Sequence, residues 1–303
     1  MQQMTERFAV LDELAAQWGL SGLELVGQGL EFTVFRARGR DGGPVAVRLA
    51  HRRLDSNAND PHLDTRDLLV QEHAIARHLA AHGLPVARAR EVILSDRPGA
   101  PDVLLSDYVE DDGSPLDSHA LGQLLARLHR VPPPRLRPVA AEGGSTAEAI
   151  AARTARRWAE VGRHVDDWPE PPAARLLARH LAGLTEGGLL HLDVRSSNIR
   201  RSHGRTTALL DWSNALLGTP ALEFGRLAEY ARYPENDLDL AALRAGYASL
   251  APAPAEDDPC LLVCRLDAAL MLANVFLSEA ADPTRGPAAA VHARELAERI
   301  ARL

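Results

Sequence analysis

The chain has 303 residues, which is enough for one large domain or for two lobes that each bury a core. Its 46% hydrophobic and 25% charged residues are typical of a soluble globular protein. A net charge of −7 provides no basic field for nucleic acid, and we find no apolar run that approaches the ~20 residues of a membrane span. Two cysteines, no disulfide framework and no signal peptide predict a cytoplasmic protein without nucleic-acid or membrane partners.

The first third of the chain has the pattern of a sheet with one helix packed on it. Alternating apolar residues, separated by glycine and proline turns, predict the strands. An apolar stripe at helical spacing predicts the helix, and Gly83-Leu-Pro85 ends it. The expected elements are a short amphipathic helix at 5–18, strands at 23–29, 30–38, 45–50, 92–94 and 103–106, a loop at 51–66 and a helix at 67–82.

The remainder of the chain reads as mostly helical. Helices are predicted at 117–131, 145–165, 172–186, 220–232, 239–250, 258–281 and 286–302. Strands gathered before helices indicate an α+β protein of two lobes. We therefore expect a smaller N-terminal lobe at 1–106, with an antiparallel sheet and one helix, and a larger helical lobe at 107–303. The cleft between two such lobes is a usual place for a nucleotide.

One stretch carries most of the functional information. Residues 191–198 read His-Leu-Asp-Val-Arg-Ser-Ser-Asn, and a short strand pattern then leads to Asp211. Phosphoryl transfer from a nucleotide needs a carboxylate at the acceptor hydroxyl, and an amide and a carboxylate on magnesium. The spacing predicts Asp193 as the first group, and Asn198 and Asp211 as Mg²⁺ ligands. Either aspartate alone would be interpreted as a turn residue.

Two further residues of this loop are ambiguous. His191 is two residues before Asp193, and we interpret it as a structural histidine that is hydrogen-bonded within the loop. Arg195 is two residues after Asp193. It is either a catalytic cation that stabilises charge on the transferred phosphoryl group or a solvated arginine.

The N-terminal lobe supplies candidates for nucleotide binding. Gly27 and Gly29 lie between two predicted strands, which argues against a Rossmann turn, because that turn must open a helix. A glycine hairpin can instead fold over a triphosphate. Glu72 falls on the apolar face of its helix and needs a partner, which Arg48 in the third strand can provide. We expect Arg48 to reach the phosphates while Glu72 orients it, although a purely structural ion pair is the alternative.

The segment that joins the lobes follows the last strand. Asp107 and Val109 begin this connection, and their backbone groups are predicted to pair with the edge of the adenine. Their side chains add no information.

Together these residues resemble the aminoglycoside phosphotransferase and choline kinase-like family, which shares the protein-kinase two-lobe fold. The loop of that family is typically His-Gly-Asp-Leu-His-x-Gly-Asn, and it is followed by an aspartate that Asp211 matches. The segment 218–225 is similar to a further family segment, and the resemblance extends from about residue 20 to residue 235. The chain departs from the family at Leu192, where the family has glycine, at Arg195, where it has histidine, and at Arg48, where it has the nucleotide-binding lysine.

The resemblance implies a Mg²⁺-dependent kinase that transfers the γ-phosphate of ATP or GTP to a hydroxyl of an antibiotic or metabolite, in resistance or tailoring. The small-molecule acceptor is expected against the helical lobe. Four acidic residues there could face a cationic acceptor, namely Glu223, Glu229, Glu235 and Asp237. The alternative is a nucleotide-binding pseudokinase or regulator, which the three departures could support. The complete set of Asp193, Asn198 and Asp211 favours the enzyme.

Overall fold

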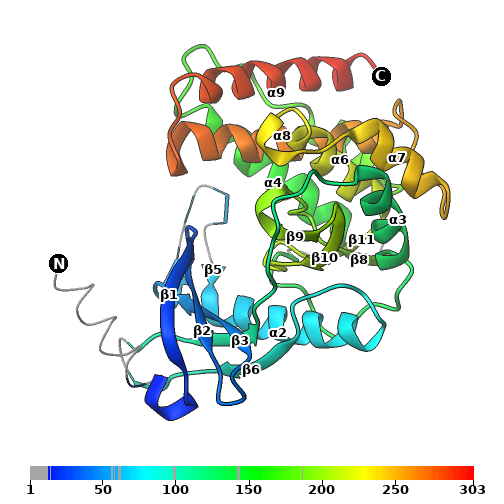
Figure 1. Cartoon of the computed structure of the whole chain (residues 1–303). Helices are drawn as coiled ribbons and strands as arrows, with labels where there is room; N and C mark the ends of the chain where they lie inside the picture. Colours follow the sequence, from blue (N-terminus) through cyan, green and yellow to red (C-terminus); the bar gives the residue numbers. More distant parts are fainter. Residues whose placement is uncertain are drawn as a thin grey trace.

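A computed structural model describes residues 13, 15–55, 57, 59–60, 63–97, 100–141, 144–185 and 187–303. An antiparallel sheet with one helix forms the N-terminal part, and helices dominate the C-terminal part (Figure 1). This arrangement confirms the predicted α+β class. The helix predicted at 5–18 lies mainly outside the described residues, and residues 15–18 are helical.

The alternation of side chains along a strand of the N-terminal sheet sets the direction of Arg48. In β3, Val45, Val47 and Leu49 are buried on one face, so Arg48 points to the opposite face, where α2 packs. The side chain of Asp64 caps the first turn of α2 by accepting from the N–H of Arg66. The strands follow the order β1 (Ser21–Gln28), β2 (Phe32–Arg38), β3 (Pro44–Ala50), β7 (Val103–Asp107) and β6 (Ala89–Ile93), all antiparallel to their neighbours, and α2 spans Thr65–Ala81.

The segment predicted as a loop at 51–66 contains two short strands. β4 (Leu54–Asp55) pairs with β5 (Leu63–Asp64), and α2 begins directly afterwards. Thr65 is fully buried, and its hydroxyl donates to the carbonyl of Arg52 at 2.7 Å. The prediction of a loop is therefore wrong for these short strands, since a polar composition does not show which backbone groups pair.

The C-terminal part is built around α8 (Pro259–Asn274). Every residue from Cys260 to Asn274 except Arg265 is buried, and the two cysteines are free thiols. The surrounding helices are α3 (Ser118–Leu128), α4 (Thr146–Val161), α5 (Ala174–Leu181), α6 (Pro220–Tyr230), α7 (Leu240–Ala248) and α9 (Arg285–Ala301). α5 is shorter than the predicted 172–186, because it has no side-chain cap and only Leu177 and Leu181 in it are buried.

The helix Pro259–Glu279, which adds the π-turn η3 (Val275–Glu279) to α8, meets the length and composition of a membrane span. This differs from the expectation that no run approaches such a length. The structure buries 78% of its apolar window, with α4, α6 and α9 packed around it. The burial identifies it as the core helix of this part of the protein.

Two short ladders frame the loop at 191–198, and only the strand pattern before Asp211 was predicted from the sequence. β8 (Gly188–Leu190) pairs with β11 (Leu216–Gly218) before the loop, and β9 (Ile199–Ser202) pairs with β10 (Arg205–Leu209) after it. The 3₁₀ turn η1 (Ser196–Asn198) ends the loop. The loop is therefore anchored at both of its ends.

We predict that Gly122→Ala will destabilise the protein by about 3 kcal/mol, because α3 and α7 pack backbone to backbone at this point. A Cβ at Gly122 would overlap the carbonyl of Leu243, and a Cβ at Gly246 would overlap the carbonyl of His119. Urea unfolding would measure the change. Gly183→Ala is the matched control, because a Cβ there meets nothing within 4 Å. Equal unfolding midpoints for the two variants would contradict the close contact.

Candidate active site

The loop at 191–198 is fixed by a buried histidine. The Nδ1 of His191 accepts the backbone N–H of Asp193 at 3.1 Å, so its Nε2 carries the proton and donates to the carbonyl of Leu210 at 2.9 Å. His191 is fully buried. It therefore joins the Asp193 loop to the strand end that precedes Asp211, as a structural histidine should.

Asp193 is the centre of a dense set of hydrogen bonds. The Tyr230 hydroxyl donates to its Oδ1, the Asn198 amide donates to its Oδ2 at 2.6 Å, and the Arg195 Nε lies 3.2 Å from Oδ1. Burial and the charge of Asp193 raise the pKa of Tyr230, so this phenol stays a donor. The Asp193 side chain is only 7% exposed, whereas that of Arg195 is 45% exposed. The carboxylate is thus held in one orientation at the edge of the buried region.

Asn198 and Asp211 offer the oxygens for a cation. The Nδ2 of Asn198 is committed to Asp193, so its amide oxygen is the group left for a metal. Asp211 has a left-handed backbone, with a φ of 63°, and its Oδ1 accepts from Arg48 at 2.9 Å and from Ser213 Oγ at 2.7 Å. Burial opposes the ionised form, but Arg48 and Ser213 outweigh it and lower the pKa of Asp211 to about 2.

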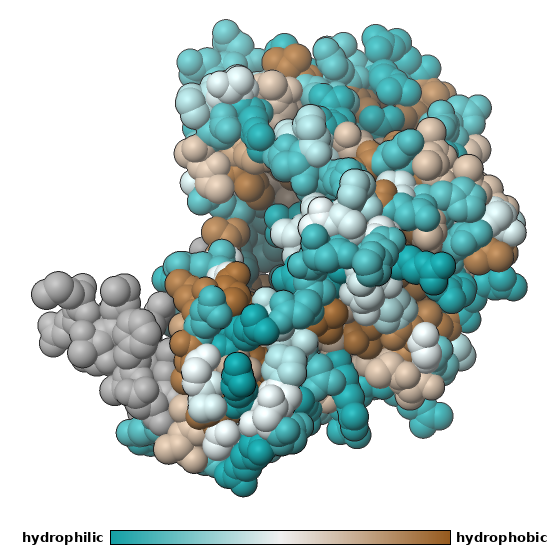
Figure 2. Space-filling view, viewed as in Figure 1, coloured by the Kyte–Doolittle hydropathy of each residue, from teal (hydrophilic) through white to brown (hydrophobic). Residues whose placement is uncertain are grey.

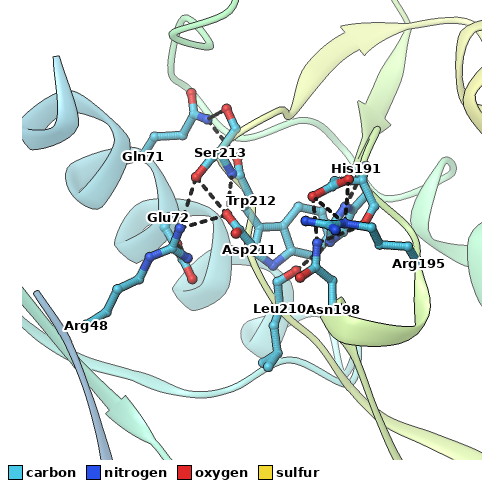
Figure 3. Close-up of polar contacts among 11 residues, drawn as sticks. Arg48, Gln71, Glu72, His191, Arg195, Asn198, Leu210, Asp211, Trp212 and Ser213 are labelled. Carbon is cyan, nitrogen blue, oxygen red and sulfur yellow. Dashed lines mark hydrogen bonds and ion pairs between the residues drawn. The ribbon is translucent and has the colours of Figure 1, made fainter. Parts of the chain in front are cut away.

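Arg48 connects the sheet, α2 and the Asp211 loop. Its Nη1 donates to Glu72 at 2.5 Å and its Nη2 to Asp211 (Figure 3). The guanidinium also lies 4.2 Å from the centre of the Phe32 ring. The predicted pairing of Arg48 with Glu72 is present. Burial raises the pKa of Glu72 to about 7, and Asp211 adds to this while Arg48 opposes it.

Next to this pair, a second residue of α2 forms hydrogen bonds with the backbone of the Asp211 loop. The Nε2 of Gln71 donates to the carbonyl of Trp212 at 2.8 Å (Figure 3). Its Oε1 accepts from the N–H of Val139 at 2.7 Å. Gln71, Ser213 and, on α6, Tyr230 were not predicted as residues of the site. An apolar-face pattern shows that such residues are near a core, but it does not show which backbone groups they meet.

Gly27 and Gly29 lie in the β1–β2 hairpin, where the N–H of Gly29 donates to the carbonyl of Phe32 at 2.8 Å. Neither glycine has a positive φ, and a Cβ on either meets only ordinary contacts at 3.7–3.8 Å. The fold alone therefore does not require glycine at these positions.

At the end of β7, the N–H of Asp107 donates to the carbonyl of Arg88 at 2.9 Å, and the Asp107 carboxylate pairs with Arg90 at 2.6 Å. Since that N–H is engaged within the sheet, a backbone contact to adenine would use the Asp107 carbonyl and the Val109 N–H.

The acidic residues expected to face a cationic acceptor are used elsewhere. Glu223 is fully buried and accepts the backbone N–H groups of His191 at 2.7 Å and Leu192 at 2.9 Å. Glu229 is 1% exposed and binds Arg265 at 2.9 Å and His292 at 2.8 Å. The expectation is wrong for both, because a buried carboxylate must satisfy its oxygens locally. Glu235 and Asp237 are exposed acids paired with Arg285 and Arg201.

Leu192 occupies a backbone conformation that suits glycine. Its φ is 61°, and its side chain is fully buried. A left-handed non-glycine residue costs about 1–2 kcal/mol. The two N–H bonds to Glu223 and the burial of the leucine side chain hold the strained position.

A family model described as "Phosphotransferase enzyme family" matches residues 22–260. The chain belongs to this family. No curated protein sequence matches it. The phosphotransferase fold is nonetheless shared with many solved structures, at low sequence identity.

Three of these structures illustrate the similarity. An aminoglycoside phosphotransferase APH(4)-Ia, in a ternary complex with ADP and hygromycin B, has a TM-score of 0.68 at 16% identity and covers 96% of this chain and 97% of its own. A fructosamine-3-kinase homologue from Thermobifida fusca reaches 0.64 at 19% identity, covering 96% and 98%. The macrolide 2'-phosphotransferase MphH from Brachybacterium faecium reaches 0.56 at 21%, covering 92% and 96%. At these identities the likeness shows the fold.

We predict that glycine will be a more stable replacement than alanine at Leu192, which is the reverse of the usual order. Leu192→Ala should lose about 3 kcal/mol through its buried cavity. Leu192→Gly should be about 1 kcal/mol more stable than the alanine variant, because glycine relieves the left-handed backbone. Leu190 is equally buried but has no positive φ, so glycine should be the less stable replacement there. Chemical denaturation would compare the four variants, and the ordinary order at Leu192 would contradict the strain.

We also predict a pH-dependent gain in stability for Glu31→Gln. Burial and the Asp211 carboxylate raise the pKa of Glu31 from 4.5 to about 7 in the folded protein. The protonated residue therefore stabilises the fold fully below about pH 4.5, and this contribution is lost as the pH rises through about 7.

Glutamine avoids the loss, so the melting temperature of the ligand-free variant should exceed that of the wild type clearly at pH 8 and only slightly at pH 5. Glu24→Gln, at an exposed position of β1, is the control. A constant difference across this pH range would contradict the assignment.

Proposed function

We propose that this chain is a small-molecule kinase that transfers the γ-phosphoryl group of ATP or GTP to an alcohol of an antibiotic or metabolite. One observation carries the proposal: the expected catalytic, metal-binding and phosphate-binding groups are connected by hydrogen bonds. Asp193 is bonded to Asn198, and His191 joins their loop to Leu210, the residue before Asp211. Asp211 in turn contacts Arg48, which is paired with Glu72. A phosphoryl-transfer site needs these groups together. The N-terminal lobe, 1–106, would bind the nucleotide, and the lobe at 107–303 would hold the acceptor.

Asn198 and Asp211 would hold Mg²⁺. An amide oxygen and a carboxylate are hard ligands of the kind this ion prefers, and it usually takes further ligands from water and phosphate. Within the described ranges no group of three His, Cys, Asp or Glu residues could bind a metal alone, so phosphate oxygens would complete the coordination. When bound, the ion would neutralise charge on the transferred phosphate.

The N-terminal residues would position the nucleotide. Arg48, kept in place by Glu72, provides a guanidinium for the phosphate oxygens. The hairpin with Gly27 and Gly29 would cover the triphosphate, and the backbone of Asp107 and Val109 would meet the adenine.

Asp193 would orient the acceptor hydroxyl. Its oxygens already accept from Tyr230, Asn198 and Arg195, an environment that suits an orienting carboxylate. The Tyr230 hydroxyl shows that an O–H group can be placed on Oδ1, where an acceptor could replace it. Arg195 would add a positive charge next to the transferred phosphoryl group.

A pseudokinase is the second candidate, and one contact favours it. The ion pair between Arg48 and Asp211, at 2.9 Å, occupies Oδ1 of the carboxylate and places a positive charge beside the expected metal position. If the pair persists with nucleotide, only Oδ2 is left for Mg²⁺, and the guanidinium repels the ion. Nucleotide binding that is unaffected by Mg²⁺, without turnover, would identify this case.

We predict that Asp193→Asn will lower kcat by about 10²–10⁴-fold, because the acceptor hydroxyl loses its charged partner. The dissociation constant for ATP should change by no more than about threefold, because Asp193 contacts neither Arg48 nor Glu72 in the described structure. Turnover would be followed as ADP release with a panel of amino sugars, macrolides, nucleosides and simple alcohols. Near-normal turnover would remove Asp193 from the mechanism.

A further inference from the structure

Three buried arginines lie near one another, and one of them, Arg226, acts on Tyr230, the partner of Asp193. Arg153 and Arg157 come from α4 and Arg226 from α6, and they are 4%, 1% and 4% exposed. Arginine is almost never buried to this extent without a paired charge.

Asp267 of α8 balances only part of this charge. Its carboxylate accepts from Arg153 at 2.7 Å and from Arg157 at 2.8 Å, so both of its oxygens are used by α4. Burial lowers the pKa of Arg157 to about 10; Asp267 opposes this, and Arg153 and Arg226 add to it. Asp267 is thus the carboxylate hydrogen-bonded to Arg153 and Arg157, while Asp60 and Glu279 act on Arg157 through space.

Arg226 is the member without a partner. It makes no hydrogen bond or ion pair with any other residue that the structure describes. Its charge acts on Asp267 through space, without a hydrogen bond. No nitrogen of Arg226 is among the fully buried side-chain atoms that lack a partner, so the guanidinium nitrogens remain accessible, and an anionic ligand can pair with them.

The position of Arg226 relates it to the acceptor. It lies one helical turn before Tyr230 on α6, and both its charge and that of Asp193 act on the Tyr230 phenol. The Tyr230 hydroxyl in turn donates to Asp193. The surface is hollowed between the sheet and the helical part, on the side where a substrate would enter (Figure 2). A small molecule with its hydroxyl at Asp193 would thus extend towards Arg226.

We propose that Arg226 binds an oxyanion on the acceptor, so the substrate is an alcohol that carries a carboxylate or a phosphate. This inference rests on the proposed kinase function and specifies its substrate class. It replaces a cationic acceptor, because Glu223 and Glu229 are consumed by internal partners. Guanidinium groups match both carboxylate and phosphate through paired N–H donors.

Binding to the whole protein, saturated with ADP and Mg²⁺, tests the inference by isothermal titration calorimetry. The probes are matched sets: glycerate, glycerol 3-phosphate and glycerol, and glucuronate, glucose 6-phosphate, glucose and glucosamine. At least one anion should bind about tenfold or more tightly than its neutral counterpart. The carboxylate and phosphate members show which oxyanion is preferred. Tighter binding of glucosamine, or no anion preference in any set, overturns the proposal.

Two substitutions connect that preference to Arg226. Arg226→Met should remove the advantage of the anion, and Arg226→Lys should keep part of it. The control is Arg232→Met, which removes the same charge from a 46% exposed arginine just beyond the same helix. An anion preference that survives in Arg226→Met contradicts the site. If Arg226→Met unfolds, the folded Arg226→Lys variant decides. Loss of the anion preference in this variant supports recognition by the paired N–H donors of the guanidinium. Tighter anion binding by the lysine variant than by the wild type contradicts it.

The two proposals fail in different ways. If Mg²⁺–ATP is bound and turned over with neutral alcohols only, the kinase function stands and the oxyanion site is wrong. If an anion binds through Arg226 but no acceptor is phosphorylated, the oxyanion site stands and the kinase function is wrong.

Discussion

The contact of Arg48 with both Glu72 and Asp211 holds the candidate site together. These three residues come from β3, α2 and the segment after β10, so the contact ties the N-terminal sheet to the helical part. Both carboxylates are partly buried. Arg48 helps to lower the pKa of Asp211 to about 2, whereas burial still raises the pKa of Glu72 to about 7, so the guanidinium stabilises the charge of Asp211 more than that of Glu72. Gln71 adds bonds from the adjacent position on α2 to the same loop. A nucleotide that binds here must therefore meet charges that already restrain one another.

The Asp193 loop is held differently, by buried side chains that hydrogen-bond to its backbone. Glu223 uses both oxygens on consecutive N–H groups, and this keeps Leu192 in a left-handed conformation. His191 uses both ring nitrogens in the same way. His191 and Glu223 thus support the loop, and under the proposed function Asp193 and Asn198 would be the groups that face a ligand.

The parts of the site that could be predicted have a periodic or a motif signature. The period of two along β3 and of 3.6 along α2 bring Arg48 and Glu72 to one interface, which the sequence indicates without a structure. Tyr230 and Arg226 have no such signature, since they look like ordinary members of a helix whose residues are almost all buried. Glu223 and Glu229 were misplaced for the related reason that a charge pattern does not reveal which acids are satisfied internally. Short ladders such as β8 with β11 depend on partners far away in the sequence.

The net charge of the chain is a poor guide to its acceptor. A charge of −7 describes the long-range field, which salt screens beyond about 8 Å at physiological ionic strength. A bound acceptor instead meets the local, buried charges, and around Tyr230 these include the unpaired Arg226. At close range such a charge acts more strongly on a ligand than distant exposed carboxylates do. Under the proposed oxyanion site, this nearby charge, and not the net charge of the chain, would select the acceptor.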